Sequence, residues 1–312
     1  MPILTFEGKK RHNALRMAHD AMHTTFEIFV IHENHIYAKQ AIYEIFQELD
    51  KLEQQFSRFI NNSDISRINA LKQNESIRIG LATFECLKQS KQLFSETNGI
   101  FNINVGSWVS YWRDRHGEQS LEKNVQNRTR QNTDWDFLKL DEKNITVTSL
   151  SKSISLDLGG IGKGYAIDRI ATLLREWDIE SALIHGGTST ALALDEPTGE
   201  KGWPITISHP DKTSGIIKKI FLKNRALSGS GLEKGQHIID PRTGRPVEHN
   251  CAAWASTEDA TSSDALSTAF MIMSPDEIEA YCAKYPDTQA LIVLKDSEDS
   301  VTKDILKYGN WE

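Results

Sequence analysis

Three short segments in the second half of the chain contain residue types that bind ligands and do chemistry, at spacings that packing alone does not require. They are residues 157–165 (DLGGIGKGY), 237–244 (HIIDPRTG) and 264–268 (DALST). They offer glycine-rich backbone for a phosphate, a histidine on a turn, and hard oxygen ligands for a cation. Together these groups are suited to binding a nucleotide diphosphate.

The first segment has four glycines within eight residues, at an expected strand-to-helix junction. Backbone amides at a helix N-terminus attract anions, and the helix dipole adds to the attraction. Lys163 adds a positive charge. The spacing matches neither the P-loop nor the GxGxxG pattern. A flexible turn explains the glycines as well as an anion site does.

The second segment begins with His237, which stands just before two isoleucines and the turn sequence of residues 240–244. Proline followed by glycine in that sequence is turn chemistry. A histidine at the end of a strand is well placed for acid–base work. The alternative is a histidine with a purely structural function.

The third segment places Asp264 and Thr268 four residues apart, on one face of an expected helix. A carboxylate and a hydroxyl suit Mg²⁺, which takes few protein ligands and keeps water and substrate phosphate. The alternative is an aspartate at a helix start, stabilised by the dipole, with a threonine bonded back to a carbonyl.

Periodicity predicts the elements that must position these segments. Strands are expected at 24–31, 145–147, 154–158, 182–185 and 290–294, and 205–208 is expected to pair with 216–222. Helices are expected at 41–56, 165–177, 264–273 and 80–98, the last with Leu81, Phe84, Leu87, Leu93 and Phe94 inward. A capping box at 274–277 opens another helix. Residues 113–135 are polar and turn-rich, which predicts a long surface loop. Interleaved elements without strict βαβ alternation favour an α+β fold.

Composition narrows the function classes. The 312 residues carry a net charge of −7, which disfavours nucleic acid as a partner. Three separated cysteines without a CxxC predict neither a disulfide framework nor a zinc site. No apolar run is long enough to span a membrane, and the N-terminus lacks signal-peptide features. We expect a cytoplasmic protein, or a periplasmic or membrane-anchored one if a leader has been removed.

In this order, the three segments resemble those of the ApbE family of FAD:protein FMN transferases. The resemblance runs from about Met22 to Leu294 and includes weaker segments at 56–69 and 97–106. It implies one transferase domain over residues 1–312, with two lobes of mixed or antiparallel sheet backed by helices (T-fold-like) and FAD between them. It also implies Mg²⁺-dependent transfer of FMN from FAD to a Thr or Ser of an acceptor protein, with release of AMP.

Carried over residue by residue, the resemblance places the metal at Asp264, Thr268 and the backbone carbonyl of Gly160, and catalysis at His237 and Asp264. The FAD contacts that it implies are Met22, Phe59, Ile100, Phe101, Asn102, Asp157, Lys163 and Ile239. Three positions depart from the usual pattern: Asn102 replaces Asp, Gly162 replaces Ala, and Thr188 replaces Asn.

Two other functions stay open from the sequence. One is an FAD pyrophosphatase that releases FMN and AMP, and the other is an FAD-binding protein without turnover. Asp264 disfavours the second, because a pure binder has little need of a carboxylate near a diphosphate. His237 could activate the acceptor hydroxyl or position the phosphate.

Overall fold

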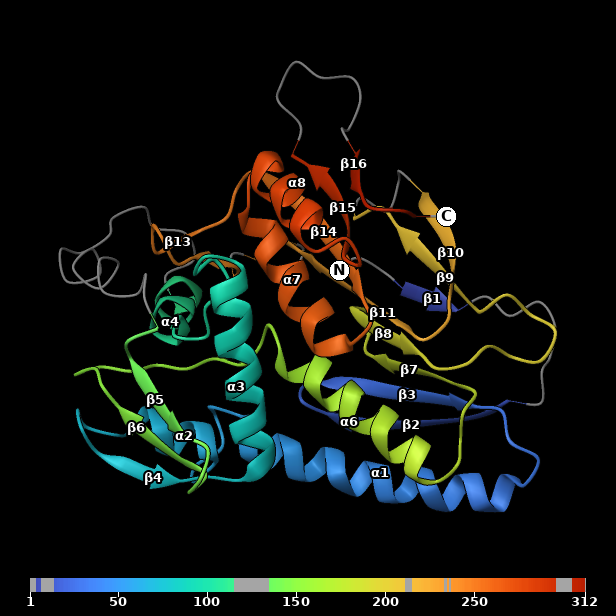
Figure 1. Ribbon diagram of the computed structural model, residues 1–312, viewed down its shortest axis with the longest axis horizontal. Helices are drawn as coiled ribbons and strands as arrows, with labels where there is room; N and C mark the ends of the chain where they lie inside the picture. The colour runs from blue at the N-terminus through green and yellow to red at the C-terminus, as the bar shows by residue number, and fades with distance from the viewer. Residues whose placement is uncertain are drawn as a thin grey trace. The chain divides into compact units, whose positions relative to one another are not determined.

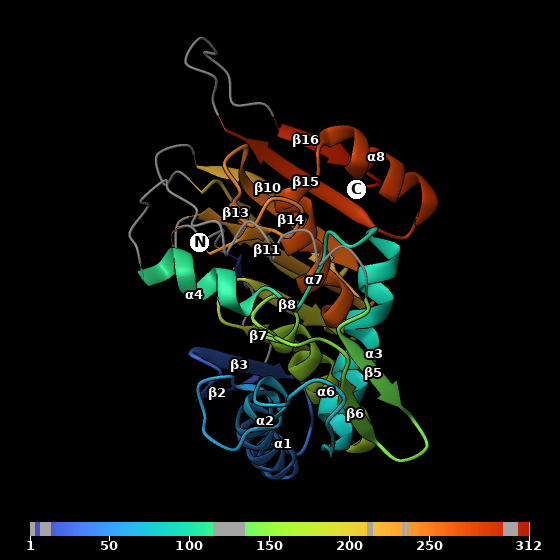
Figure 2. The ribbon, with the colours of Figure 1, turned by 90° about the vertical axis from the view of Figure 1, so that its left-hand side faces the viewer.

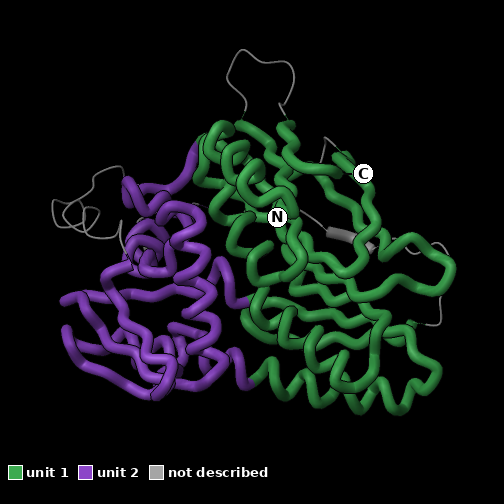
Figure 3. The backbone as a smooth tube through the Cα atoms, in the orientation of Figure 1, with its two compact units in different colours: residues 1–50, 163–233, 249–312 green, residues 51–162, 234–248 purple. Residues whose placement is uncertain are grey.

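The computed structural model describes residues 4–6, 14–114, 135–210, 215–232, 235, 237–295 and 305–311. The chain divides into two compact units (Figure 3). Unit 1 comprises residues 1–50, 163–233 and 249–312, and unit 2 comprises residues 51–162 and 234–248. One boundary lies inside helix α1 (His35–Phe56) and another at the start of helix α6 (Gly162–Glu176).

Unit 1 is built on a long antiparallel sheet with the strand order β16-β15-β14-β11-β8-β7-β3-β2 among the described residues (Figure 1). Its strands are β2 (Leu15–Ala21), β3 (Thr24–Val30), β7 (Ala182–Gly186), β8 (Thr190–Ala193), β11 (Arg225–Gly231), β14 (Asn250–Thr257), β15 (Gln289–Leu294) and β16 (Ile305–Tyr308). A smaller antiparallel sheet contains β1 (Leu4–Phe6), β9 (Trp203–Ser208) and β10 (Ile216–Leu222).

The small sheet and the helices cover opposite faces of the long sheet. Ala191 and Ala193 of β8 share one buried apolar cluster with Trp203 and Ile205 of β9. Thr190 of β8 points the other way, because side chains alternate along a strand, and it contacts helix α7 (Ala260–Ile272). Helix α7 also lies along β11 and β14 (Figure 2). Unit 1 therefore has three layers, and α7 is enclosed between neighbours.

Helix α7 is buried along almost its whole length, as expected of a helix with apolar or small residues on every side. Asp259 caps its start by accepting the amide hydrogen of Ser262. Helix α8 (Pro275–Lys284) begins at the predicted capping box, in which both hydrogen bonds between Ser274 and Glu277 are present. None of the described helices is long and apolar enough to cross a membrane.

Unit 2 surrounds the end of α1 with shorter elements. Its helices are α2 (Asp64–Asn69), α3 (Leu81–Glu96) and α4 (Gly106–Asp114), and its strands are β4 (Ser76–Arg78), β5 (Leu138–Asp141), β6 (Thr146–Ser149), β12 (Ile239–Asp240) and β13 (Arg245–Pro246). The β12–β13 hairpin packs on α4 through a cluster of Trp108, Trp112 and Ile239. The indole of Trp112 donates to the Gly244 carbonyl at 2.8 Å.

The α+β class is confirmed, as is the pairing of 205–208 with 216–222. Three helices begin earlier than predicted: α1 at His35, α6 at Gly162 and α7 at Ala260. Asp264 is therefore not a helix-starting aspartate, since Asp259 takes that position. Residues 115–134 of the predicted loop lie outside the described residues, and Arg113 belongs to α4. The single transferase domain over residues 1–312 stays a prediction.

The strand predicted at 154–158 is wrong. The Ser155 amide donates to the side chain of Asn104 at 2.8 Å. Both backbone groups of Leu156 bond to the side chain of Asn69, at 2.6 and 3.1 Å. The Ser155 carbonyl and the Asp157 amide pair instead with the backbone of Gly106 and Ile103, both at 2.8 Å. Asparagine side chains thus take hydrogen bonds that a regular neighbouring strand would have made, and the run is extended without joining a sheet.

Leu81 was predicted to face inward, but 59% of its surface is exposed. It is the first residue of α3, whose other predicted inward residues are buried. A helix buries its apolar stripe where it meets a neighbour, and the first turn can extend beyond that contact.

Gly164 allows α6 and α7 to approach each other. A Cβ atom at this position would lie 2.7 Å from the carbonyl carbon of Ala260 and 2.8 Å from the Cα of Thr261. Both neighbours are backbone atoms at the start of α7, so neither can rotate away. The glycine is thus required by the closeness of two helices.

We expect Gly164→Ala to destabilise the protein by about 1–3 kcal/mol, because the added methyl group forces the two helix starts apart. Gly162→Ala is the matched control. Its Cβ would meet Phe56 and Leu158 at ordinary contact distances of 3.5 and 3.6 Å. It should be neutral or stabilising by up to about 1 kcal/mol. Urea unfolding of both variants checks this, and equal effects would contradict it.

Candidate functional site

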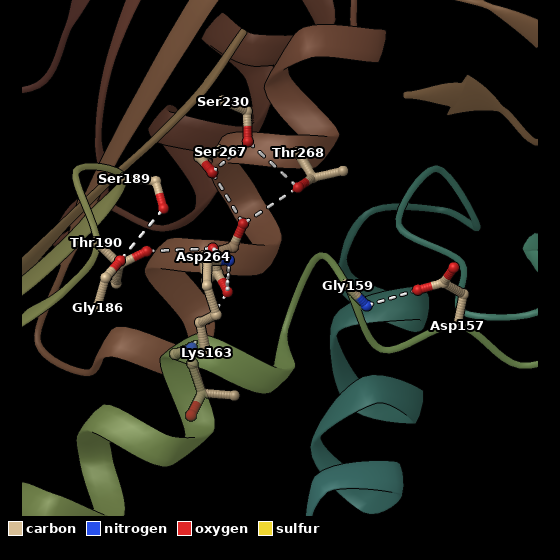
Figure 4. A network of polar contacts seen from close by, with 12 residues as sticks. Asp157, Gly159, Lys163, Gly186, Ser189, Thr190, Ser230, Asp264, Ser267 and Thr268 are labelled. Carbon is tan, nitrogen blue, oxygen red and sulfur yellow. Dashed lines mark hydrogen bonds and ion pairs between the residues drawn. The ribbon is translucent and has the colours of Figure 1, made fainter. Parts of the chain in front are cut away.

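The carboxylate of Asp264 is the centre of a buried polar network in unit 1 (Figure 4). Its side chain is only 4% exposed and lies in the second turn of α7. The ammonium of Lys163 is 3.1 Å from each carboxylate oxygen. The Gly164 amide donates to Oδ2 at 3.1 Å, and the Thr190 hydroxyl donates to Oδ1 at 3.3 Å. Four hydrogen bonds from three residues thus offset the cost of burying this charge.

Hydroxyl groups gather one helical turn further along α7. Ser267 and Thr268 both donate to the backbone carbonyl of Asp264, at 2.9 and 3.3 Å. The hydroxyl of Ser230 on β11 lies 2.9 Å from that of Ser267 and 3.4 Å from that of Thr268. The back-bonded threonine that the sequence allowed is therefore present. A hydroxyl that donates its hydrogen still has lone pairs on its oxygen, so the bond is compatible with binding a cation.

This donor set fits Mg²⁺. One carboxylate and neighbouring hydroxyls are hard oxygen ligands, and Mg²⁺ binds one or two carboxylates while keeping water and substrate phosphate. Across the described residues no group of three His, Cys, Asp or Glu side chains could hold a metal, so a cage of such ligands is not formed there. The Lys163 ammonium beside Asp264 shows that a positive charge is stable at this carboxylate. Gly160, the third predicted ligand, belongs to unit 2, and its participation stays a prediction.

Backbone amides of the glycine segment (residues 157–165) already donate hydrogen bonds to groups of the chain itself. The Gly159 amide donates to Asp157 Oδ1 at 2.8 Å, and the Gly162 amide donates to the Leu158 carbonyl at 2.7 Å. The anion held by the first turn of α6 is the Asp264 carboxylate, through the amide of Gly164. Helix-terminus anion binding is therefore present, but the anion at that amide is a protein side chain and not a phosphate.

His237 lies two residues before β12 and is exposed. Its Nδ1 is 2.8 Å from the Gly235 carbonyl oxygen, which can only accept a hydrogen. The neutral ring therefore carries its hydrogen on Nδ1, and Nε2 is its basic nitrogen. In this tautomer Nε2 carries the lone pair with which a general base accepts a proton.

Residues 22–292 match the model of the ApbE family. The chain belongs to the ApbE family. It is similar to proteins named FAD:protein FMN transferase, one of which, from Chlamydia muridarum, is 28% identical over 245 residues, covering 74% of this chain and 75% of the relative. Another, from Escherichia coli strain K12, is 25% identical over 252 residues, covering 74% and 70%. The predicted family is confirmed, and the relatives carry the predicted enzyme name.

Solved structures of ApbE proteins have the same fold. The flavin transferase ApbE from Vibrio cholerae superposes with a TM-score of 0.81 at 22% identity, covering 95% of this chain and 96% of the other. The apo flavinyl transferase ApbE from Pseudomonas stutzeri gives 0.82 at 21% identity, covering 95% and 94%. At this identity the likeness shows the fold alone, which confirms the ApbE-like α+β architecture.

The ApbE resemblance did not point to Arg58, which joins three segments of unit 2. Its Nη1 donates to the Gly106 carbonyl at 2.9 Å, its Nε lies 3.0 Å from Asp157 Oδ2, and its guanidinium lies 4.8 Å from the ring centre of Phe59. The side chain is 9% exposed, and none of the described residues accepts a hydrogen bond from Nη2. In the sequence, the signal for Arg58 was its position directly before Phe59, a predicted FAD contact.

Phe59 itself is 61% exposed, and Arg113 of α4 lies 5.3 Å from its ring centre. A largely exposed aromatic ring with two guanidinium groups nearby can stack on a planar ligand. Met22 is also unusual, since it forms a two-residue hairpin turn with His23, both at positive φ (52° and 58°). Such strain in residues other than glycine often accompanies function.

The remaining predicted FAD contacts are buried in unit 2. Ile100, Phe101 and Asn102 are 5%, 4% and 7% exposed, and Ile239 is 4% exposed within the α4 cluster. Asn102 Oδ1 accepts the Asn104 amide at 2.8 Å. An aspartate would accept the same bond, which explains why Asn serves at this turn. Contact of these residues with FAD stays a prediction.

Asp168, a second residue that the ApbE resemblance did not point to, fixes α7 in place. From α6 it accepts the amide hydrogens of Ala260 and Thr261, each at 2.8 Å, and the Thr261 hydroxyl. Desolvation raises the pKa of Asp168 to about 6, and the nearby charge of Asp259 adds to the rise, while the bonds from Thr261 and Ala260 oppose it. Helices α6 and α7 thus each supply a carboxylate to the start of the other.

Because its pKa is raised from 3.8 to about 6 on folding, Asp168 contributes stability below about pH 4 that is lost as the pH rises through 6. Between pH 4 and pH 7 the free energy of unfolding of the natural chain should fall by on the order of 2–3 kcal/mol relative to that of Asp168→Asn, at about 1.4 kcal/mol per pKa unit. Urea unfolding of both proteins from pH 4 to 7.5 measures the difference. A difference that does not change with pH would disprove the raised pKa.

Proposed function

We propose that this chain transfers FMN from FAD to a Thr or Ser hydroxyl of an acceptor protein, with Mg²⁺ bound at Asp264 and Thr268, and releases AMP. One observation carries the proposal: the single buried carboxylate of Asp264 lies beside the Lys163 ammonium and the Thr268 hydroxyl. Membership of the ApbE family supports the same chemistry. The placement of FAD between two lobes and the cytoplasmic location remain predictions.

The reaction is a phosphoryl-group transfer without any change of oxidation state. The acceptor hydroxyl oxygen attacks the phosphorus on the FMN side of the FAD pyrophosphate, and a new O–P bond forms. The bond from that phosphorus to the bridging oxygen breaks, and AMP leaves with the electron pair. Bound Mg²⁺ would neutralise the charge that develops on the phosphate oxygens.

The chain's own groups have separate tasks in this proposal. Asp264 and Thr268 hold the cation, and Lys163 supplies a further positive charge beside it. Phe59, which is 61% exposed, stacks on a planar ring of FAD. His237 accepts the hydrogen of the acceptor hydroxyl at Nε2, because Nδ1 is committed to the Gly235 carbonyl.

Asp264→Asn tests the proposal. Asparagine keeps the size of the side chain and an oxygen that accepts a hydrogen bond, but it removes the charge that a divalent cation requires. We expect covalent FMN on the acceptor, followed by in-gel fluorescence, to fall at least 100-fold, with AMP falling equally. FAD binding measured without Mg²⁺ should be retained. Unchanged Mg²⁺-dependent transfer would refute the metal site. AMP and free FMN from the natural chain, without labelled acceptor, would indicate the pyrophosphatase instead.

His237→Ala separates chemistry from binding. Loss of a general base should lower the transfer rate on the order of 10²–10⁴-fold. FAD affinity, measured by flavin fluorescence, should change little. His249→Ala, at an exposed histidine of unit 1, serves as the control and should match the natural chain. A parallel loss of FAD affinity would assign His237 to positioning the phosphate.

A further inference from the structure

The ammonium of Lys163 is paired with the Asp264 carboxylate, which is the group that a divalent cation needs. The ammonium is equidistant from both carboxylate oxygens, at 3.1 Å, so neither oxygen is left to the cation alone. The lysine side chain is 20% exposed and the aspartate 4% exposed, so solvent screens the pair poorly. In the structure the carboxylate is already neutralised by the chain's own cation.

Charge balance then decides what else can bind. A divalent cation placed beside the pair leaves two uncompensated positive charges in a buried position, which is unfavourable. The diphosphate of FAD carries two negative charges. The network returns to neutrality only when the cation and the diphosphate are bound together.

We propose that Lys163 couples metal binding to donor binding. Without FAD its ammonium stays on Asp264 and opposes a divalent cation, and with FAD it turns to the diphosphate and yields the carboxylate to the metal. This inference rests on the proposed function. Coupling of this kind is reciprocal, so FAD strengthens metal binding by the same factor as the metal strengthens FAD binding.

The surroundings of Lys163 suit such an exchange. A lysine is a compact charge on a flexible stem, so its head can move while the backbone of α6 stays in place. The Gly164 amide and the Thr190 hydroxyl still hold the carboxylate after the ammonium has left. Asp264 therefore keeps its position in both states, and only its cation changes.

Lys163→Met tests the coupling with Mn²⁺ as the probe, measured by electron paramagnetic resonance on the nucleotide-free chain. We expect Mn²⁺ to bind at least ten times more tightly to this variant than to the natural chain. In a flavin fluorescence titration, the gain in FAD affinity caused by Mg²⁺ should shrink about tenfold. Unchanged Mn²⁺ affinity, or an unchanged gain, would overturn the proposal.

Lys163→Arg is a second test of the coupling if the Lys163→Met variant does not fold. Its planar fork holds a carboxylate with two hydrogen bonds, so Mn²⁺ alone should bind less tightly than to the natural chain. Lys152→Met removes an exposed lysine outside the network and should change nothing. Mn²⁺ binding to Asp264→Asn as tight as to the natural chain would refute the metal site itself. If Asp264→Asn loses Mn²⁺ binding but the Lys163 variants bind Mn²⁺ like the natural chain, only the coupling is refuted.

Discussion

The reciprocal capping of α6 and α7 is the interaction on which the rest of the site depends. Asp264 of α7 accepts the Gly164 amide of α6, and Asp168 of α6 accepts the first two amides of α7. Each carboxylate lies at the positive end of the other helix, where the dipole favours negative charge. The absent side chain at Gly164 makes the approach possible. Without this contact, Lys163 and Asp264 would not meet.

A buried carboxylate such as that of Asp264 has a stability cost, which four hydrogen bonds offset locally, two of them from the ammonium of its ion-pair partner Lys163. Unit 2 contains a similar arrangement around Arg58, where a buried guanidinium holds Asp157 and lies on Phe59. In both places a charged group organises backbone and side chains at once. Charges that are fixed in this way need little reorganisation when a ligand arrives, which is how preorganised sites stabilise developing charge.

The sequence predicted most elements, but it misjudged where three helices begin. Helix α7 starts four residues before Asp264, because Asp259 caps it and the small residues Ala260, Thr261 and Ser263 are buried. The same early start moved Asp264 from a helix end into a buried second turn. At 154–158 the sequence predicted a strand that is not formed, because side chains of Asn104 and Asn69 take backbone hydrogen bonds that a neighbouring strand would have made.

The sequence by itself identified the family, through the resemblance of three motifs in a fixed order. It also predicted the α+β class and the shared helix face of Asp264 and Thr268, because these depend on local pattern. Only the tertiary structure decided that Lys163 lies on Asp264, that Asp168 caps α7 and that Arg58 joins Phe59 to Asp157. Apart from the contact of Arg58 with its neighbour Phe59, these contacts link residues about 90 to 100 positions apart in the sequence. A local sequence pattern cannot identify partners that are far apart in the chain, because packing and the burial of charge select them.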